Sequence, residues 1–166
     1  MLDKSQIRLI NSDNQKLTKD IKSCEKSKLL KDILIDYEKE EDLPLPEVDS
    51  ETLKYVIEYL EHYKNSEPIP INKPLTNNDI NIVLEKQPWD LEFISKFSEE
   101  ALYKLINAAN YMDIYPLLSL SCCRIACELQ DKPISEIQKI IGIECDMTEE
   151  QKKNMINILL IKNMLL

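Results

Sequence analysis

The chain opens with a pattern that alternates between polar and apolar side chains. Over residues 6–10, Ile7 and Leu9 fall on one side of the backbone, as in a strand with one buried face. The polar run Asn-Ser-Asp-Asn at 11–14 follows before apolar residues resume, which predicts a β-hairpin. We expect Asn14 to adopt a positive φ, because asparagine tolerates the left-handed region better than most residues.

Further along, apolar residues recur at helical spacing. The clearest helix is capped by Asp49 or Ser50 and has apolar residues at i, i+3, i+4 and i+7 counted from Leu53. Capping residues and prolines set the ends of the others. We expect helices over 27–35, 50–63, 98–110, 116–129 and 133–141, and a last one from Thr148 toward the terminus.

Prolines and charges interrupt this pattern. The acidic run 36–42 is typical of a solvated loop, and Leu-Pro-Leu-Pro at 43–46 fits an edge strand or an extended connector. Residues 65–88 contain four prolines and leave little room for a continuous helix. Strands mixed with helices, followed by a purely helical last third, predict an α+β domain with a C-terminal helical extension.

The composition limits the partners that we expect. Asp and Glu number 30 against 21 Lys and Arg, so the net charge is -9 and a nucleic-acid partner is not expected. The longest aliphatic run, Ile158–Ile161, is too short for a transmembrane helix, and the first residues do not resemble a secretory signal. We therefore expect a cytoplasmic and nuclear protein with no membrane partner.

The sequence gives little support for a catalytic site or a metal site. One glycine, Gly142, and one histidine, His62, exclude glycine-rich phosphate loops and multi-histidine metal sites. The cysteines are odd in number and irregularly spaced, which indicates reduced thiols. They are Cys24, Cys122, Cys123, Cys127 and Cys145.

Two arrangements of cysteines could form a metal site or a catalytic site. Cys123 and Cys127 can share one helical face, but without a second pair they are more typical of small buried hydrophobes than of metal ligands. Cys122 with His62 could serve as nucleophile and base, yet nothing in the sequence orients such a pair. We expect no catalytic residue, no cofactor and no metal, and hence no enzyme.

Several motifs occur in one order with one spacing. They are LPLPEVDSETLKYVIEYLEHY at 43–63, PWDLEFI at 88–94, LYKLINAANYMDIYPLLSLSC at 102–122, and the stretch 135–143 followed by DMTEEQ. Together they resemble the S-phase kinase-associated adaptor family, the small subunit of SCF ubiquitin ligases. The resemblance covers nearly the whole chain.

The resemblance implies a fold and a function. It implies a BTB/POZ fold, a small sheet packed with helices, over residues 1–130 with a proline- and asparagine-rich loop near 65–88. Residues 131–166 would form a helical tail that binds F-box proteins. The function implied is that of an adaptor that bridges F-box substrate receptors to a cullin for protein ubiquitination.

The family's binding positions carry over residue by residue. Those matching the cullin surface are Asn110 and Tyr111, although from the residues alone Asn110 could be a helix C-cap. We assign to the F-box surface Trp89, Phe93, Phe97, Leu118, Cys122, Ile125, Leu129, Ile141 and Ile143. The aromatic members could instead bury much area within the domain.

The positions from Leu118 to Leu129 recur at i, i+4, i+7 and i+11, a stripe that from periodicity alone is more typical of an intramolecular core. The same helix offers Leu117 and Leu120 to the core from another angle. Two apolar faces on one helix indicate that one of them serves a partner.

Three departures from the family stand out. The loop 65–87 is less acidic and more aliphatic than usual, so we expect part of it to fold or pack. The C-terminal INILLIKNMLL lacks the family's frequent Asn, Trp and Cys, which puts the F-box contacts of that end in question. Pro133 is displaced by one position from a proline that some members modify, and we predict no modification there.

Other functions remain open at this point. An elongin C-like BTB/POZ subunit would leave the tail dispensable, and a self-associating BTB/POZ scaffold would dimerise through its own sheet and helices. A weak homodimer of the free chain is compatible with either. A thiol enzyme would depend on Cys122 and has no other support.

Overall fold

The computed structural model describes residues 6–35, 42–75, 77–130, 132–133 and 135–137. The chain divides into two compact units, Met1–Gln130 and Asp131–Leu166. In the second unit, Lys132 and Glu136 form an ion pair at 2.8 Å, one helical turn apart. The helix expected from Thr148 and most of the one expected over 133–141 lie outside the described residues.

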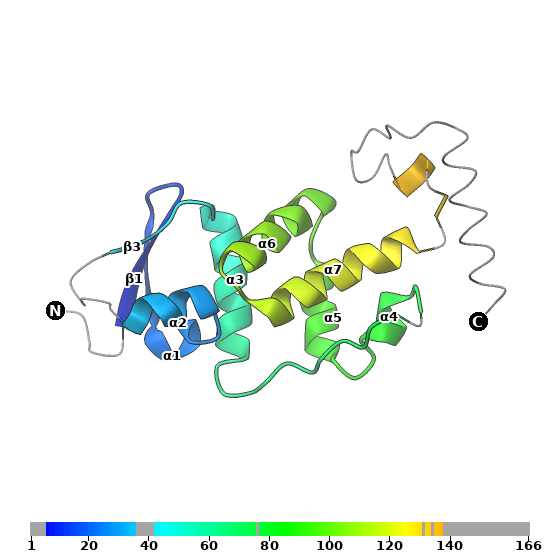
Figure 1. The fold of residues 1–166 in the computed structure, drawn as a ribbon, viewed down its shortest axis with the longest axis horizontal. Helices are drawn as coiled ribbons and strands as arrows, with labels where there is room; N and C mark the ends of the chain where they lie inside the picture. Colours follow the sequence, from blue (N-terminus) through cyan, green and yellow to red (C-terminus); the bar gives the residue numbers. More distant parts are fainter. Residues whose placement is uncertain (1–5, 36–41, 76, 131, 134, 138–166) are drawn as a thin grey trace. The chain divides into compact units, whose positions relative to one another are not determined.

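The first unit contains a three-stranded sheet in the order β2-β1-β3 (Figure 1). The strands are β1 (Gln6–Asn11), β2 (Lys16–Asp20) and β3 (Leu43–Leu45). β1 and β2 form the predicted antiparallel hairpin, and Asn14 in its turn has a φ of 58°. β3 pairs with β1 in parallel and is an edge strand, which suits a segment whose prolines cannot donate to a ladder.

The hairpin turn is tied to the helix that follows β3. The Asp13 carboxylate accepts hydrogen bonds from the backbone nitrogen of Ser50 at 2.7 Å and from its hydroxyl at 2.6 Å. The Asn11 side-chain oxygen accepts from the backbone nitrogen of Gln15 at 2.8 Å and shapes the turn from inside. These bonds fix the sheet against the helical part of the unit.

The helices account for most of the first unit. Those that the sequence predicts are α2 (Lys28–Ile35), α3 (Ser50–His62), α6 (Glu99–Tyr111) and α7 (Tyr115–Leu129). The structure adds α1 (Ile21–Cys24) and α4 (Ile80–Val83), of four residues each, and α5 (Pro88–Ser95), which is as long as α2. Among the described residues, no helix is long and apolar enough to cross a bilayer. This is the α+β fold that the sequence predicts.

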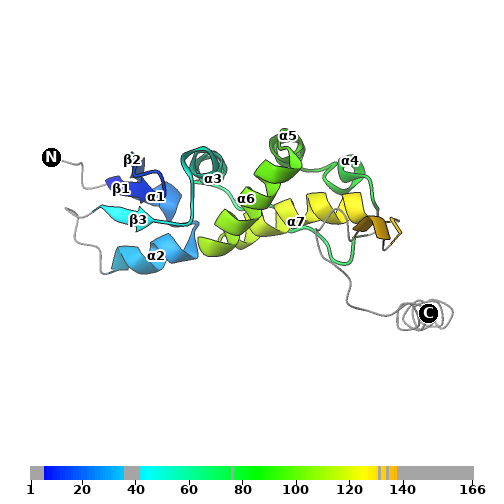
Figure 2. The same ribbon diagram turned by 90° about the horizontal axis from the view of Figure 1, so that it is seen from above.

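One hydrophobic core runs through the unit. It joins Leu9 of β1 to Leu60 of α3, Leu105 of α6 and Leu117 of α7, each fully buried. α6 contacts α3 on one side and α7 on the other, while α7 also contacts α4 and α5. The sheet with α1 and α2 lies at one end of the unit, and α4 lies at the other (Figures 1 and 2).

Part of the loop between α3 and α5 is folded, as its aliphatic content predicted. Leu84 is fully buried, and Ile71, Ile80 and Val83 pack against the core. The helix within this segment, α4, spans only four residues, so the described part of the segment contains no long helix, as predicted. The segment contacts α7 through α4.

Two helix N-termini are capped by side chains that the sequence singles out. An Asp49 carboxylate oxygen accepts from the backbone nitrogen of Thr52 at 2.7 Å, and the Ser98 hydroxyl oxygen accepts from that of Ala101 at 3.3 Å. The bond from Thr52 holds the pKa of Asp49 below its usual value, and Lys104 at 3.5 Å acts in the same direction. The charged carboxylate thus stabilises the start of α3.

Replacing Asp49 by alanine should lower the free energy of unfolding at pH 7 by about 1 kcal/mol, because the first turn of α3 loses its cap. Asp49→Asn keeps the capping oxygen and should change it by only a few tenths. Urea unfolding of both variants at pH 7 tests this expectation. An Asp49→Ala variant as stable as the unaltered chain would contradict it.

The same pair of variants gives a pH test. A carboxyl whose pKa is lowered by folding stabilises the folded state above its unfolded pKa, near 3.9, and loses that contribution as the pH falls through the folded pKa. Asp49→Asn should therefore lose less stability than the unaltered chain between about pH 5 and pH 2. Equal acid sensitivity would contradict the assigned charge effect.

Candidate interaction surface

Helix α7 has two different apolar faces. One face lies in the core, where Leu117 is 0% and Leu120 is 2% exposed. The other is the α7 stripe, which we define as Leu118, Cys122, Ile125 and Leu129. Cys122 is exposed and the other three side chains are half-buried. The stripe therefore keeps apolar area on the surface although its helix is anchored in the core.

The local sequence explains why α7 adopts this orientation. Pro116 lies in its first turn, where a missing backbone N–H costs nothing. Ser121 also faces the core, and its hydroxyl donates to the carbonyl oxygen of Leu117 at 2.9 Å, so no polar group is left unpaired by its burial. The steps of four, three and four residues keep the α7 stripe on a narrow band of the helix surface.

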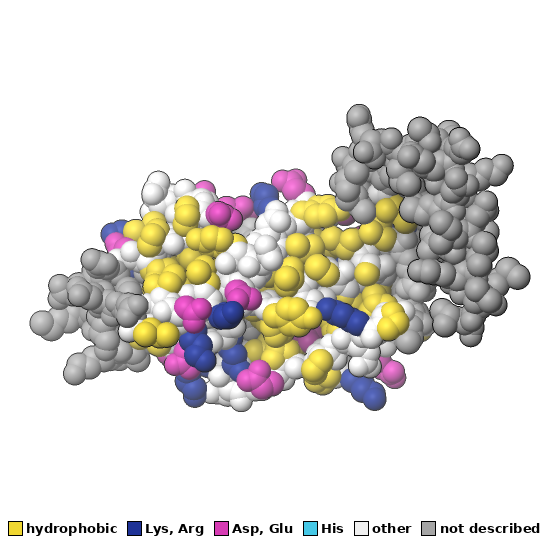
Figure 3. Space-filling model, in the orientation of Figure 1, with side chains coloured by type: hydrophobic (Ala, Val, Ile, Leu, Met, Phe, Trp, Pro, Cys, Tyr) yellow, Lys and Arg dark blue, Asp and Glu magenta, His cyan; other side chains and the backbone are white. Residues whose placement is uncertain are grey.

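A polar edge accompanies the stripe. Arg124 and Glu128 form an ion pair one turn apart, and Glu128 follows Ile125 by three residues, so it lies next to the stripe on the helix surface. Figure 3 shows hydrophobic side chains gathered over α6 and α7 on the face of the first unit that is turned toward the viewer. An apolar strip beside charged residues is typical of a surface that binds an apolar segment of another protein.

The second candidate patch lies at the other end of α7, where α6 ends. Asn110 is exposed and Tyr111 is half-buried. The C-cap of α6 is Met112, so Asn110 belongs to the helix itself rather than capping it. Burial, with a contribution from the charge of Glu47, raises the pKa of Tyr111 above its ordinary value.

The junction between α6 and α7 is fixed by the start of α2. The Ser27 hydroxyl donates to the carbonyl oxygen of Met112 at 2.5 Å, and the Lys28 backbone nitrogen donates to that of Asp113 at 3.3 Å. Asp113 adopts a φ of 50° at this turn. Because a helix rises 1.5 Å per residue, Ile125 lies about 15 Å along α7 from the junction. The far part of the stripe is thus separated along α7 from the second patch, whereas its first member, Leu118, lies only about 5 Å along the helix from the start of α7.

The three aromatic residues assigned to the F-box surface lie in different environments. The Trp89 ring stacks on His62 with centroids 3.6 Å apart and on Phe93 with centroids 5.0 Å apart. Phe93 is only 2% exposed and belongs to the core, so it offers little area to a partner. Trp89 and Phe97 are half-buried and keep some exposed area.

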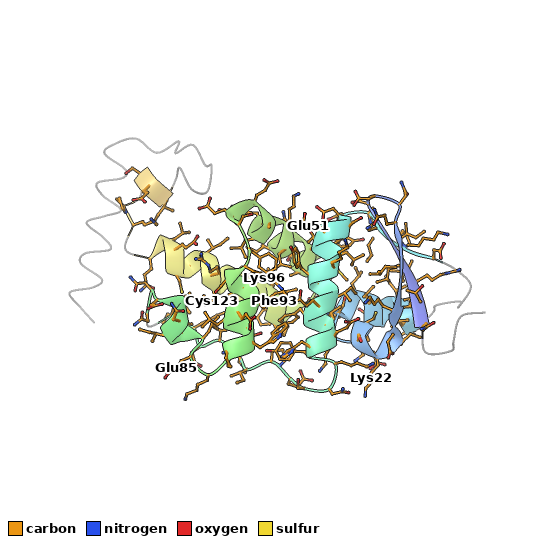
Figure 4. All side chains as sticks on the ribbon, turned by 180° about the vertical axis from the view of Figure 1, so that it is seen from behind. Lys22, Glu51, Glu85, Phe93, Lys96 and Cys123 are labelled. Carbon is orange, nitrogen blue, oxygen red and sulfur yellow. The ribbon has the colours of Figure 1, made fainter. Side chains whose placement is uncertain are left out.

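A feature of this region that sequence reasoning missed is Lys96. Its ammonium lies 4.6 Å from the centroid of the Phe93 ring and 2.7 Å from a carboxylate oxygen of Glu58 (Figure 4). The lysine thus connects α5 to α3 and covers the core aromatic ring from the solvent side. Lys96 follows Phe93 by three residues, the spacing of neighbours on one helix face, and this is the signal that could have found the contact.

The remaining site predictions concern thiols, metals and the tail. Cys24, Cys123 and Cys127 are buried, and no described cysteine forms a disulfide. No three metal-ligating side chains lie together within the described part of the chain. Ile141 and Ile143, assigned to the F-box surface, lie outside the described residues.

A small three-stranded sheet packed with helices is the fold of a BTB/POZ protein, and comparison with known proteins agrees. The family model for the Skp1 family tetramerisation domain matches residues 5–65, and that for the Skp1 family dimerisation domain matches residues 115–157. The chain belongs to the Skp1 family.

Individual relatives match over nearly their full length. A Tetrahymena thermophila protein, the S-phase kinase-associated protein 1 homolog, is 35% identical over 148 residues, which cover 89% of this chain and 88% of the relative. The suppressor of kinetochore protein 1 of Schizosaccharomyces pombe is 34% identical over 90% of this chain and 92% of its own. The E3 ubiquitin ligase complex SCF subunit sconC of Talaromyces marneffei is 34% identical over 89% and 90%.

The two faces of α7 predict different thiol reactivities. Burial raises the pKa of Cys123 to about 12, whereas its neighbour Cys122 is exposed. Because the thiolate is the reactive form, iodoacetamide at pH 8 should modify Cys122 at least tenfold faster than Cys123 in the folded chain. Tandem mass spectrometry of the peptide that contains both residues measures the two rates.

Unfolding in urea supplies the control, since both thiols should then react at similar rates. Equal rates in the folded chain would show that the α7 stripe and the core face are not distinguished as described.

Proposed function

We propose that this chain is the adaptor subunit of an SCF-type cullin ubiquitin ligase. In this proposal the α7 stripe binds the F-box of a substrate receptor, and Asn110 with Tyr111 binds a cullin. The observation that carries it is the apolar face that α7 leaves at the surface while its opposite face is buried. The name of the Talaromyces relative, an SCF subunit, supports the same assignment.

The chemistry of the stripe suits an apolar partner segment. Burial of apolar surface drives such association without needing a directional bond, and the neighbouring ion pair of Arg124 and Glu128 supplies a polar edge. Trp89 and Phe97 add aromatic area from the α5 region. The tail 131–166, with Ile141 and Ile143, would complete the F-box contacts.

An adaptor of this kind works by geometry. It holds the receptor with its substrate at one surface and the cullin at another, so that the substrate meets the ubiquitin-carrying end of the ligase at a high effective concentration. No catalytic side chain, cofactor or metal is required of this chain. We propose that it acts in the cytoplasm and nucleus.

Two alternatives make different predictions for the same surfaces. An elongin C-like subunit would bind its partner equally well after truncation at Gln130, whereas the proposed adaptor would lose F-box affinity. A self-associating scaffold would show mass doubling at micromolar concentration, and the mutations below would abolish it. A weak homodimer of the free chain through the α7 stripe is compatible with the adaptor if an F-box displaces it.

Replacing Leu118 and Ile125 together by glutamate should weaken F-box binding by at least about 100-fold, roughly 3 kcal/mol, because a buried carboxylate without a partner is heavily penalised. The isolated variant should remain folded, since both side chains are only half-buried. Titration calorimetry with a purified F-box domain measures the binding, and circular dichroism measures the fold.

Two control variants make this test specific. Ile35→Glu places the same charge at a residue that is 77% exposed and off the stripe, and should leave binding unchanged. Leu105→Glu buries the charge in the core and should unfold the domain. If the stripe variant unfolds as Leu105→Glu does, the stripe belongs to the core and the F-box surface is misplaced.

Replacing Asn110 and Tyr111 by lysine should abolish binding of a cullin amino-terminal domain and leave F-box binding intact. Unpaired charge buried at an interface is costly. Asn110 is exposed and Tyr111 is half-buried at the edge of the core, so a lysine at either position can extend its ammonium into water in the free chain. Pull-down of the two partners by the same preparation measures both activities. Loss of both together would contradict the separation of the surfaces.

A further inference from the structure

A cavity of about 270 Å³ lies under the segment that follows α3. Residues 68–71, Pro-Ile-Pro-Ile, form one wall, which we call the Pro-Ile strap. Tyr59 of α3 and the first turns of α5 and α7 supply the other walls, including Leu120 of α7. These parts of the chain are far apart in sequence and all belong to the first unit.

The size and lining of this cavity suit a small molecule. An apolar protein cavity of about 150 Å³ is large enough for benzene, so this one has room for a ring and a side arm. Its walls are mostly apolar, with a few polar side chains among them, which is the usual composition of a small-molecule site. Neither the proposed F-box surface nor the proposed cullin surface uses it, apart from sharing α7.

The polar end of the cavity is Asp90, whose side chain is only 2% exposed. The Tyr63 hydroxyl lies 2.8 Å from each of its carboxylate oxygens. With its amide nitrogen facing inward, Gln87 donates to one of these oxygens at 2.9 Å and to the carbonyl oxygen of Ile69 at 3.1 Å. Both donors are neutral, so they orient the carboxylate without balancing its charge.

The charge of Asp90 is not paired within the described part of the chain. None of the ion pairs formed by the described residues includes it, although His62 lies close enough to influence it. Burial raises the pKa of Asp90, and the Tyr63 hydrogen bond and His62 act in the opposite direction. A carboxylate has about four lone-pair sites, so two donors leave capacity for another.

Lys73 is the basic residue that lines the cavity, and it contacts α7 rather than Asp90. The Lys73 ammonium lies 3.2 Å from the Tyr115 hydroxyl and 3.4 Å from the Ser119 hydroxyl, and all of these atoms are outside the core. Lys73 is exposed, so water screens its charge, whereas Asp90 is shielded. The buried carboxylate therefore has the stronger influence on which ligand the cavity prefers.

We propose that this cavity binds a small ring-bearing amine, with the ring against the Pro-Ile strap and the amino group on Asp90. The site is a ligand-binding function in addition to the proposed adaptor role and does not depend on it. The strap also borders a second hollow, which is lined by Ile69, Pro70 and Ile71 as well. The strap is thus not packed in the core on both sides.

Phenethylamine is a suitable probe, with phenethyl alcohol as the neutral match and 3-phenylpropionate as the match of opposite charge. Ligand-observed NMR with the full chain should show phenethylamine binding with a Kd of roughly 1 mM or below, as expected for a ligand of this size. The alcohol and the acid should bind at least tenfold more weakly. No binding at several millimolar, or equal binding of the acid, would overturn the proposal.

Variants locate the binding. Asp90→Asn keeps the shape of the side chain and should weaken phenethylamine at least tenfold while leaving phenethyl alcohol unchanged. Ser119→Phe fills the cavity from its rim and should abolish binding of both, whereas Ser95→Phe on α5, outside the lining, should not. Unchanged phenethylamine binding by folded Ser119→Phe would overturn the site even if Asp90→Asn failed to fold.

Discussion

The structure depends on the burial of Leu117 and Leu120 against the core. With these two side chains inside, the α7 stripe lies on the other side of the helix, where Leu118 and Ile125 are half-buried at the edge of the core and Cys122 is exposed. No further contact is needed to keep the stripe at the surface, because α7 is anchored by the buried side chains of its opposite face. A partner can therefore dock on α7 without first displacing it from the domain.

The fixed junction between α6 and α7 holds the second patch, Asn110 and Tyr111, in place next to the helix that carries the α7 stripe. The start of α2 holds the turn through the bond from Ser27 to Met112, so Asn110 and Tyr111 have a constant position relative to α7. An adaptor fixes the position of one partner relative to the other only if its two binding surfaces do not move independently. The packing of α6 between α3 and α7 supplies that rigidity and makes an adaptor role physically reasonable.

Local chemistry made much of the fold predictable from the sequence. The positive φ of Asn14 and the cap at Asp49 follow from single residues, and regular apolar spacing marked α2, α3, α6 and α7. α5 is as long as α2 but was missed because its buried residues include the polar Asp90, which breaks the pattern. The two faces of α7 were foreseen, but the burial of Phe93 and the cavity beside Asp90 arise from contacts between distant segments, which periodicity does not report.

The proposed adaptor would hold two partners at once, on separate surfaces of the first unit. Native mass spectrometry of the full chain mixed with an F-box domain and a cullin amino-terminal domain measures this directly. We expect a complex containing one copy of each, and binding of either partner should not weaken binding of the other. Only the two binary complexes, with each partner displacing the other, would contradict it.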